Sequence, residues 1–225
     1  MEKERGISVK SDQFSTSLHA AVLLGMLFCA CVFCGCSATQ LEKRNFPMVA
    51  AVDHRDGTFV FAYGFPSLSQ KDNTDLEEAK VNVPMTTGIS FAECLASYEG
   101  QMSRKADCSH LKVLVLGEKL LQDEPAFYDM LDTLADSELY PRNTYVCVAE
   151  DVSALFETEE NLPQDLGTYL EQFLQNHESD RQICLENLGK LLDERKNRRE
   201  AVELPYLSVV DGAIVLDGSV EVEFR

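Results

Sequence analysis

Residues 111–117 have the sequence Leu-Lys-Val-Leu-Val-Leu-Gly, and this stretch sets the architecture that we expect for the chain. The run is apolar at nearly every position and has the length of a β-strand. Because a strand that is covered on both faces has no polar side, the stretch predicts a central strand of a sheet. Gly117 is expected to end that strand.

Two β-rich runs precede this strand, at residues 46–53 and 58–64. They are separated by His54-Arg55-Asp56-Gly57, and an Asp-Gly pair at the end of a short polar turn indicates a β-hairpin. Residues 66–87 come next and are polar and charged without a sustained period. We expect them to form a long surface excursion, with residues 67–80 as its most mobile part.

Helical patterns alternate with strand patterns in the rest of the chain. Ser90 and Glu93 match a capping box, in which Ser90 accepts from the backbone of Glu93 and the Glu93 carboxylate reaches back to the amide of Ser90. A helix is expected from Ser90 to about Arg104, and another from Pro125, with Asp123 as its cap. Two further helices are expected at 165–176 and 183–199. Strands are expected at 144–149, 206–210, 213–216 and 220–224. This order predicts an α/β (α+β) domain with a mixed β-sheet, flanking helices and a terminal β-meander.

The first 36 residues have the layout of a secretory leader. Three cations lie before residue 11, and residues 18–35 carry no Asp, Glu, Lys or Arg. The apolar run ends in Gly35-Cys36, which resembles a bacterial lipobox and makes Cys36 the expected site of lipidation. We therefore expect residues 1–35 to be a lipoprotein signal peptide and residues 36–225 to form a single α/β domain.

Two alternatives to cleavage at Cys36 stay open. The apolar run is close to the length that spans a bilayer, so an uncleaved membrane anchor competes with the lipoprotein reading. Cys31 is a rival lipidation site, although more apolar residues follow it. Phe33 and Cys34 also depart from the Leu and the small residue that a lipobox usually has at these positions. Both readings place the rest of the chain outside the cytoplasm on a membrane.

The charge of the chain excludes one class of function. The formal net charge is −18, and the charges of the leader cancel, so residues 36–225 keep all of it. So acidic a surface repels nucleic acid and anionic lipid headgroups. We expect no nucleic-acid partner.

The residues that carry chemistry form no recognisable catalytic or metal-binding motif, so we expect no enzyme, cofactor or metal site. The one conceivable nucleophile and base are Cys108 and His110, which would share a face of a strand. Without a third, orienting group we interpret them as an ordinary thiol and a histidine at a strand edge. Acidic residues that a cation might attract are interpreted first as turn and cap residues: Asp53, Asp56, Asp151, Asp211 and Asp217.

Four cysteines follow the leader region, at positions 94, 108, 147 and 184. Their spacing fits no zinc template, and three disulfide pairings are formally possible. Cys94 and Cys147 lie in apolar patterns and are expected to be small buried hydrophobic residues. A domain of this size does not need a disulfide, and we expect none.

The order of these pieces resembles the Ger(x)C spore germination lipoproteins, the C subunits of nutrient germinant receptors. The resemblance rests on Gly35-Cys36, on the His-Leu-Lys, apolar strand and Gly-Glu segment of 109–118, and on the Arg and strand of 141–149. Members of this family commonly have Trp-Asp after the cysteine, where this chain has Ser37-Ala38, and they continue into a larger C-terminal part. We therefore expect residues 36–225 to correspond to the family's N-terminal domain.

The resemblance implies a receptor subunit that is not an enzyme. Its implied partners are the membrane and the A- and B-type membrane subunits of a germinant receptor, on the outer face of the spore inner membrane. It offers no catalytic residue, and Cys36 is the only functional residue that it assigns. The alternative from the sequence is an exported solute-binding lipoprotein with one small-molecule pocket.

Overall fold

The computed structural model describes residues 44–66, 85–198 and 200–224. Contacts divide the chain into residues 1–41 and 42–225, and every described residue belongs to the second unit. The expected leader, with Cys36, and the expected mobile segment at 67–80 lie outside the described residues.

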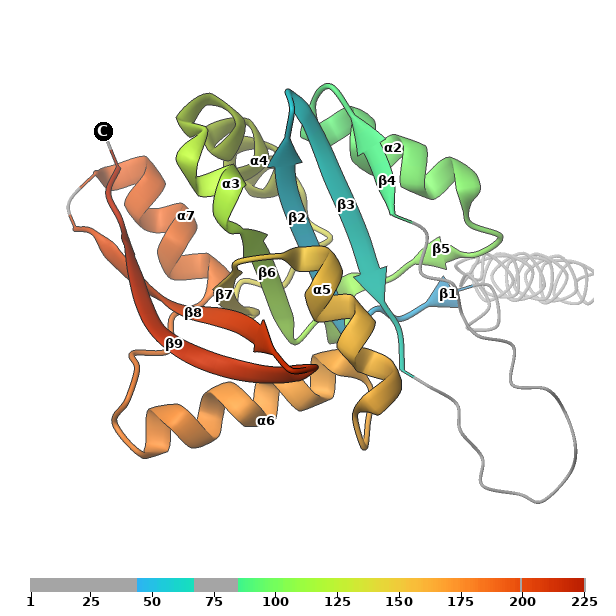
Figure 1. The fold of residues 1–225 in the computed structure, drawn as a ribbon. Coiled ribbons are helices and arrows are strands. Elements are labelled where there is room, and N and C mark those ends of the chain that lie inside the picture. The colour runs from blue at the N-terminus through green and yellow to red at the C-terminus, as the bar shows by residue number, and fades with distance from the viewer. Residues whose placement is uncertain (1–43, 67–84, 199, 225) are drawn as a thin grey trace, which may run out of the picture. The chain divides into compact units, whose positions relative to one another are not determined.

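The apolar run at 111–117 forms the centre of the sheet, as predicted. Its strand, β6 (Val113–Gly117), is buried at every residue. It pairs in parallel with β2 (Val49–Arg55) on one side and with β7 (Tyr145–Ala149) on the other (Figure 1). Gly117 is its last residue.

Seven described strands form one mixed sheet, which confirms the expected fold class. Their order is β4-β3-β2-β6-β7-β8-β9, and the four strands from β2 to β8 are parallel. An antiparallel neighbour flanks this block on each side, and β4 pairs antiparallel with β3. The outer strands are β3 (Thr58–Gly64), β4 (Thr86–Gly88), β8 (Val202–Val210) and β9 (Ala213–Val222), and a separate pair is formed by β1 (Arg44–Asn45) and β5 (Lys105–Ala106).

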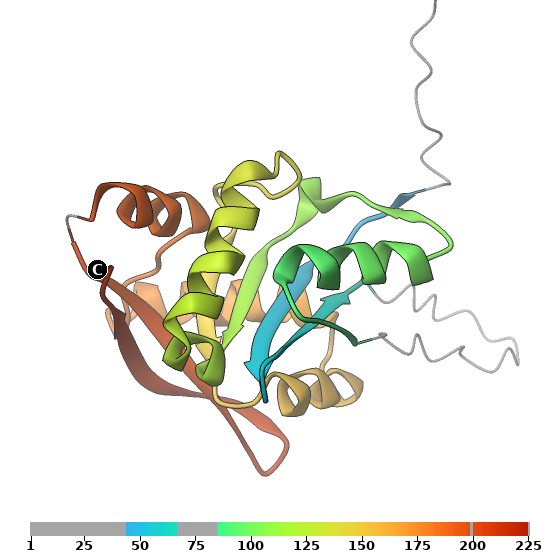
Figure 2. The same ribbon diagram turned by 90° about the horizontal axis from the view of Figure 1, so that it is seen from above.

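Helices cover both faces of the sheet and create two hydrophobic clusters (Figure 2). Because side chains alternate along a strand, Leu114 and Leu116 of β6 enter one cluster, and Val113 and Val115 enter the other. The first cluster lies under α2 (Phe91–Gln101), α3 (Glu118–Gln122), α4 (Glu124–Asp136) and α7 (Leu188–Asn197), with the 3₁₀ turn η2 (Cys108–His110). The second lies under α5 (Val152–Glu157) and α6 (Leu166–Ser179), which are joined through the 3₁₀ turn η3 (Thr158–Asn161).

The predicted hairpin of β2 and β3 is confirmed, but its turn is tighter than expected. Asp56 and Gly57 alone form the turn, with φ of 53° and 76°, the left-handed pair that a two-residue hairpin requires. His54 and Arg55 therefore lie in β2, paired with Phe59 and Thr58. Their side chains point to opposite faces of the strand end, where the turn interpretation would have left them in solvent.

The helix caps agree with the sequence in most respects. Ser90 accepts from the amide of Glu93 at 3.2 Å, but the Glu93 carboxylate accepts from the amide of Ile89 at 3.0 Å and not from that of Ser90. Asp123 caps α4 by accepting from the amide of Ala126 at 3.2 Å.

Several boundaries differ from the expectations. Helix α2 ends at Gln101, before Arg104, and α7 begins at Leu188, because Asn187 caps it by accepting from the amide of Lys190. The expected surface excursion at 66–87 contains the start of strand β4. The terminal strands form one hairpin, because the segments expected at 213–216 and 220–224 join into the single strand β9, which ends at Val222. The register of this hairpin shifts between Pro205 and Leu207 of β8, and Gly218 has a φ of 99° in the part of β9 that faces this shift.

Candidate functional site

Polar side chains gather where the parallel strands end. In parallel sheets the carboxyl ends of the strands meet at one edge, and ligands bind there more often than elsewhere. At this edge β2 ends in Asp53-His54-Arg55, β6 is followed by Glu118, and β7 is followed by Glu150-Asp151. Two features result, a buried ion-pair network and a groove.

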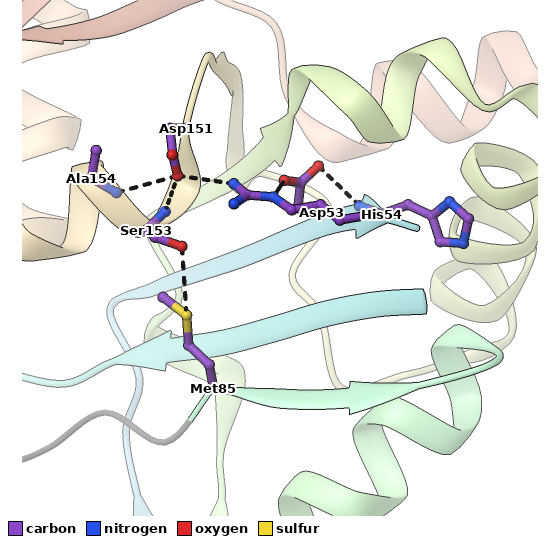
Figure 3. A network of polar contacts seen from close by, with 7 residues as sticks. Asp53, His54, Met85, Asp151, Ser153 and Ala154 are labelled. Atoms are coloured by element: carbon purple, nitrogen blue, oxygen red, sulfur yellow. Dashed lines mark hydrogen bonds and ion pairs between the residues drawn. The ribbon is translucent and has the colours of Figure 1, made fainter. Parts of the chain in front are cut away.

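Asp53 is the centre of the network. It is 1% exposed, and its carboxylate accepts from its neighbouring amide, that of His54, at 2.9 Å and from the guanidinium of Arg55 (Figure 3). A carboxylate removed from water needs such partners, because an unpaired buried charge costs several kcal/mol (~3–5). The Arg55 guanidinium is therefore a structural requirement for the buried Asp53.

Gly117 makes room for the Asp53 carboxylate. The two residues follow the paired positions Val52 and Leu116 on adjacent strands. A Cβ atom on Gly117 would lie 2.0 Å from Oδ1 of Asp53, far inside van der Waals contact. The glycine that ends the apolar strand thus lets the acid lie across the end of β6.

Arg55 connects the network to the next loop of the edge. Its second nitrogen donates to Oδ1 of Asp151 at 2.9 Å, and the same oxygen accepts from the amides of Ser153 and Ala154 at 2.8 and 3.3 Å (Figure 3). Asp151 is thus the N-cap of α5. The hydrogen bond from Arg55 is the main reason that the pKa of Asp151 lies below its ordinary value, with the two amides adding to it.

The network is arranged for structure more than for chemistry. Arg55 pairs with both Asp53 and Asp151, and these contacts tie the ends of β2, β6 and β7 together. His54 lies on the other face of β2, where its Nδ1 is 3.1 Å from Asp123 and its ring packs on Phe59. Among the described residues, no hydroxyl or thiol hydrogen-bonds to His54, so the pair of His54 and Asp123 has no nucleophile next to it.

The structure does not assemble Cys108 and His110 into a nucleophile and base. They lie on a 3₁₀ turn and not on a strand. The Cys108 thiol donates to the hydroxyl of Tyr63 at 3.2 Å, and Tyr63 shares a hydrogen bond of 2.6 Å with Tyr140. Burial raises the pKa of Cys108 to about 11, which keeps the thiol protonated and unreactive. The His110 ring instead packs edge-on against Phe46.

The acidic residues singled out from the sequence serve as turn, cap and pairing residues. Asp56 and Asp211 occupy left-handed turn positions, and Asp217 accepts from the hydroxyl of Ser208 at 2.8 Å. Across residues 44–66, 85–198 and 200–224, no group of three metal-ligating side chains comes together.

A groove lies beside the network, between α3 and α4 on one side and β8 and β9 on the other. Its volume is about 310 Å³. Three aromatic residues and four glutamates line it, together with aliphatic side chains: Phe127, Tyr128, Tyr206, Glu118, Glu124, Glu221, Glu223, Leu121, Val148, Val220 and Val222, with Gln122. Tyr206 donates to Oε2 of Glu118 at 2.9 Å and fixes that carboxylate at the wall.

Sequence reasoning missed Arg55 and the groove. The signal for Arg55 was the spacing Asp53-x-Arg55, which puts an acid and a base on one face of a strand once the turn is shortened to two residues. No local signal marks the groove, because Glu118 and Tyr206 are 88 residues apart.

The four cysteines of the described part have free thiols. Cys94 and Cys147 are fully buried in the two hydrophobic clusters, as predicted, and Cys184 is exposed. Cys36 lies outside the described residues. Among the helices that the structure describes, none has both the length and the apolar character needed to cross a membrane.

A comparison with models of protein families places most of the chain in a family. A family model described as spore germination protein N-terminal domain matches residues 37–209, which is more than half of the 225-residue chain. The matched range starts directly after Cys36 and ends within β8. No curated protein and no solved structure matches the chain significantly.

Proposed function

Because the chain belongs to the family of spore germination protein N-terminal domains, we propose that it is a lipid-anchored subunit of a nutrient germinant receptor that acts through protein–protein contacts. Membership implies the C subunit of such a receptor, and this family is not known to be catalytic. The resemblance to Ger(x)C lipoproteins is confirmed at the level of this N-terminal domain. The family match is the observation that carries the proposal.

The proposed partners are the A- and B-type membrane subunits of the receptor. The architecture supports a binding role, since Arg55 pairs with Asp53 and Asp151 at the carboxyl ends of the strands and holds these loops in place. An ordered edge of this kind presents a fixed surface, which lowers the entropy cost of docking.

The proposed anchor is a diacylglycerol on Cys36, exposed after removal of residues 1–35. The remaining residues 36–225 would then form one α/β domain held at the outer face of the spore inner membrane. The match that begins at Ser37 supports this boundary, because it places the family's domain directly behind the cysteine.

One observation favours the alternative of a solute-binding lipoprotein, namely the groove of about 310 Å³, which is within the size range of small-molecule sites. Its lining includes four carboxylates and no lysine or arginine. Such a lining repels the carboxylate of a free amino acid or an organic acid, and so narrows the alternative to cationic solutes.

The test uses the full chain, produced in a spore-forming host together with A- and B-type subunits. Intact-mass analysis of membrane extracts should show a chain that begins at Cys36 and carries a diacylglycerol, and the A and B subunits should co-isolate with it. Cys36→Ala should abolish both results. The matched control is Cys34→Ala, which changes a neighbouring cysteine and should change neither. An unprocessed mass in the native chain, or co-isolation that persists in Cys36→Ala at an equal level, would refute the anchored-subunit proposal.

A further inference from the structure

We infer that the groove between α3–α4 and β8–β9 receives a lysine or arginine side chain from a partner protein. The inference rests on the proposed function, because it names the chemistry through which a receptor partner docks. It is carried by the shape of the groove, its uncompensated charge and its aromatic walls.

The charge of the groove differs from that of the ion-pair network beside it. Asp53 and Asp151 share Arg55, and Asp107 pairs with Arg44 at 2.6 Å. In the groove, by contrast, Glu118, Glu124 and Glu221 form no ion pair with any described residue. Three carboxylates around one hollow repel one another, and a cation that enters it relieves that repulsion.

Glu118 is held ready for such a cation by neutral donors. Its Oε2 accepts from the Tyr206 hydroxyl at 2.9 Å, and its Oε1 accepts from the Gln122 side chain at 3.1 Å. Both donors fix the position of the carboxylate without cancelling its charge. A fixed carboxylate loses little entropy when it binds a cation.

The aromatic walls suit the stem and the head of a basic side chain. Phe127 and Tyr206 offer apolar surface for the methylene stem, and ring faces attract the cation itself. The third aromatic residue of the lining, Tyr128, already binds a cation through its ring face, because the guanidinium of the protein's own Arg195 lies 3.9 Å from the ring centroid.

A side chain of a protein fits the groove better than a free amino acid does. The lining offers no cationic side chain to receive a carboxylate, so a free amino acid would bring one attractive and one repulsive charge. Within a peptide chain the α-carboxyl and α-amino groups are neutral amides, and the side-chain charge acts alone. β9 ends the order of described strands, so its outer edge can also pair with an extended backbone.

The experiment uses the full chain in nanodiscs of neutral lipid and a fluorescent probe peptide, acetyl-Ala-Arg-Val-Arg-Ala-amide, with anisotropy as the readout. The matched probe replaces both arginines by citrulline, which keeps the shape and removes the charge. We expect the arginine peptide to bind and the citrulline peptide to bind at least about tenfold more weakly, the loss of roughly one charge-assisted contact.

A pair of double variants separates the groove from the general acidity of the chain. Glu118→Gln/Glu221→Gln removes two charges inside the groove, and Glu157→Gln/Glu178→Gln removes two from exposed positions on α5 and α6. The groove variant should weaken arginine-peptide binding about tenfold, and the control less than twofold. Thermal unfolding of both variants checks that the fold is kept.

Equal weakening by the two double variants would overturn the inference, because binding would then follow net charge. Tyr206→Phe supplies a second measurement, since it leaves every charge in place and frees Glu118, and a two- to threefold loss is expected. Selective peptide binding without co-isolation of receptor subunits would overturn the proposed function and leave the groove site standing. Co-isolation without selective peptide binding would overturn the groove site alone.

Discussion

At the scale of single residues, Gly117 is the described glycine at which an added Cβ would make the shortest contact. Replacing it with alanine puts a methyl group 2.0 Å from Oδ1 of Asp53 and 2.2 Å from its Cγ. The Asp53 side chain is buried, so it cannot move out into solvent to make room. Either the strands separate or the buried carboxylate leaves Arg55. We expect Gly117→Ala to lower the free energy of unfolding by about 2–4 kcal/mol, measured by urea denaturation.

The control for this variant is Gly100→Ala in α2. A Cβ at Gly100 meets nothing within 4 Å, and alanine is the better helix former, so the change should be neutral or stabilising by up to about 1 kcal/mol. A cost for Gly117→Ala no larger than about 0.5 kcal/mol would show that the edge of the sheet relaxes easily around Asp53.

Asp151 links stability to pH. Its pKa is depressed in the folded chain, so the folded form binds a proton less readily than the unfolded form does. Its stabilising contribution is therefore complete above the ordinary value of 3.8 and is lost as the pH falls through the lower folded value. The side chain is 49% exposed, and solvent screening keeps the contribution below about 1 kcal/mol.

We therefore expect Asp151→Asn to be less stable than the native chain at pH 7, and we expect this gap in stability to narrow as the pH falls below 3.8. Urea denaturation across this range measures the gap between the two. Asp56→Asn, at an exposed turn position that tolerates asparagine, controls for the loss of one carboxylate. A gap of constant size from pH 7 to pH 2.5 would contradict the linkage to Arg55.

The residue scale also shows where sequence reasoning is strong and where it fails. Asp123 and Ser90 were identified as caps because a cap depends on three or four consecutive residues. Arg55 was assigned to a turn, since the choice between a two- and a four-residue turn is decided by pairing of His54 and Arg55 with β3. That Arg55 is the partner of Asp53 therefore became clear only from the pairing of β2 with β3 in the structure.

At the scale of elements, the cap of α2 is testable by itself. Ser90 satisfies the amide of Glu93, which has no carbonyl partner in the first turn of the helix. Ser90→Ala should lower the free energy of unfolding by about 1 kcal/mol. Ser97→Ala, the same change within the same helix, removes only a hydrogen bond from the Gln101 side chain and should cost less than about 0.3 kcal/mol. Equal costs in the two variants would mean that the Ser90 hydroxyl does not cap the helix.

Element types were predictable because the hydrophobic period is local, whereas several boundaries were not. The buried run of β6 and the apolar face of α4 follow directly from their periods. Strand β4 has three residues and no period of its own, and exists because β3 offers it an edge. The late start of α7 is set by Asn187, whose bridge to Tyr145 holds it outside the helix.

At the scale of the whole molecule, the groove marks the limit of sequence reasoning. The mixed sheet was predictable from the alternation of strands and helices, because successive strands of a chain usually lie side by side, as β6, β7 and β8 do here. The groove joins α3 and α4 to the terminal hairpin, and its two walls are far apart along the chain. Only the placement of β8 beside β7 brings Tyr206 to Glu118.

The charge of the whole molecule predicts that residues 37–225 do not bind an anionic membrane by themselves. Residues 37–225 carry the full −18, since the three cations and three anions of residues 1–36 cancel. A chain of residues 37–225 should not sediment with vesicles containing 30% phosphatidylglycerol, at either low or high salt, because anionic headgroups repel it. Residues 36–225 coupled through Cys36 to a maleimide lipid should sediment fully, in a Cys184→Ser background because that thiol is exposed. Binding of the uncoupled chain that disappears with added salt would instead reveal a basic face strong enough to hold the protein on the membrane without an anchor.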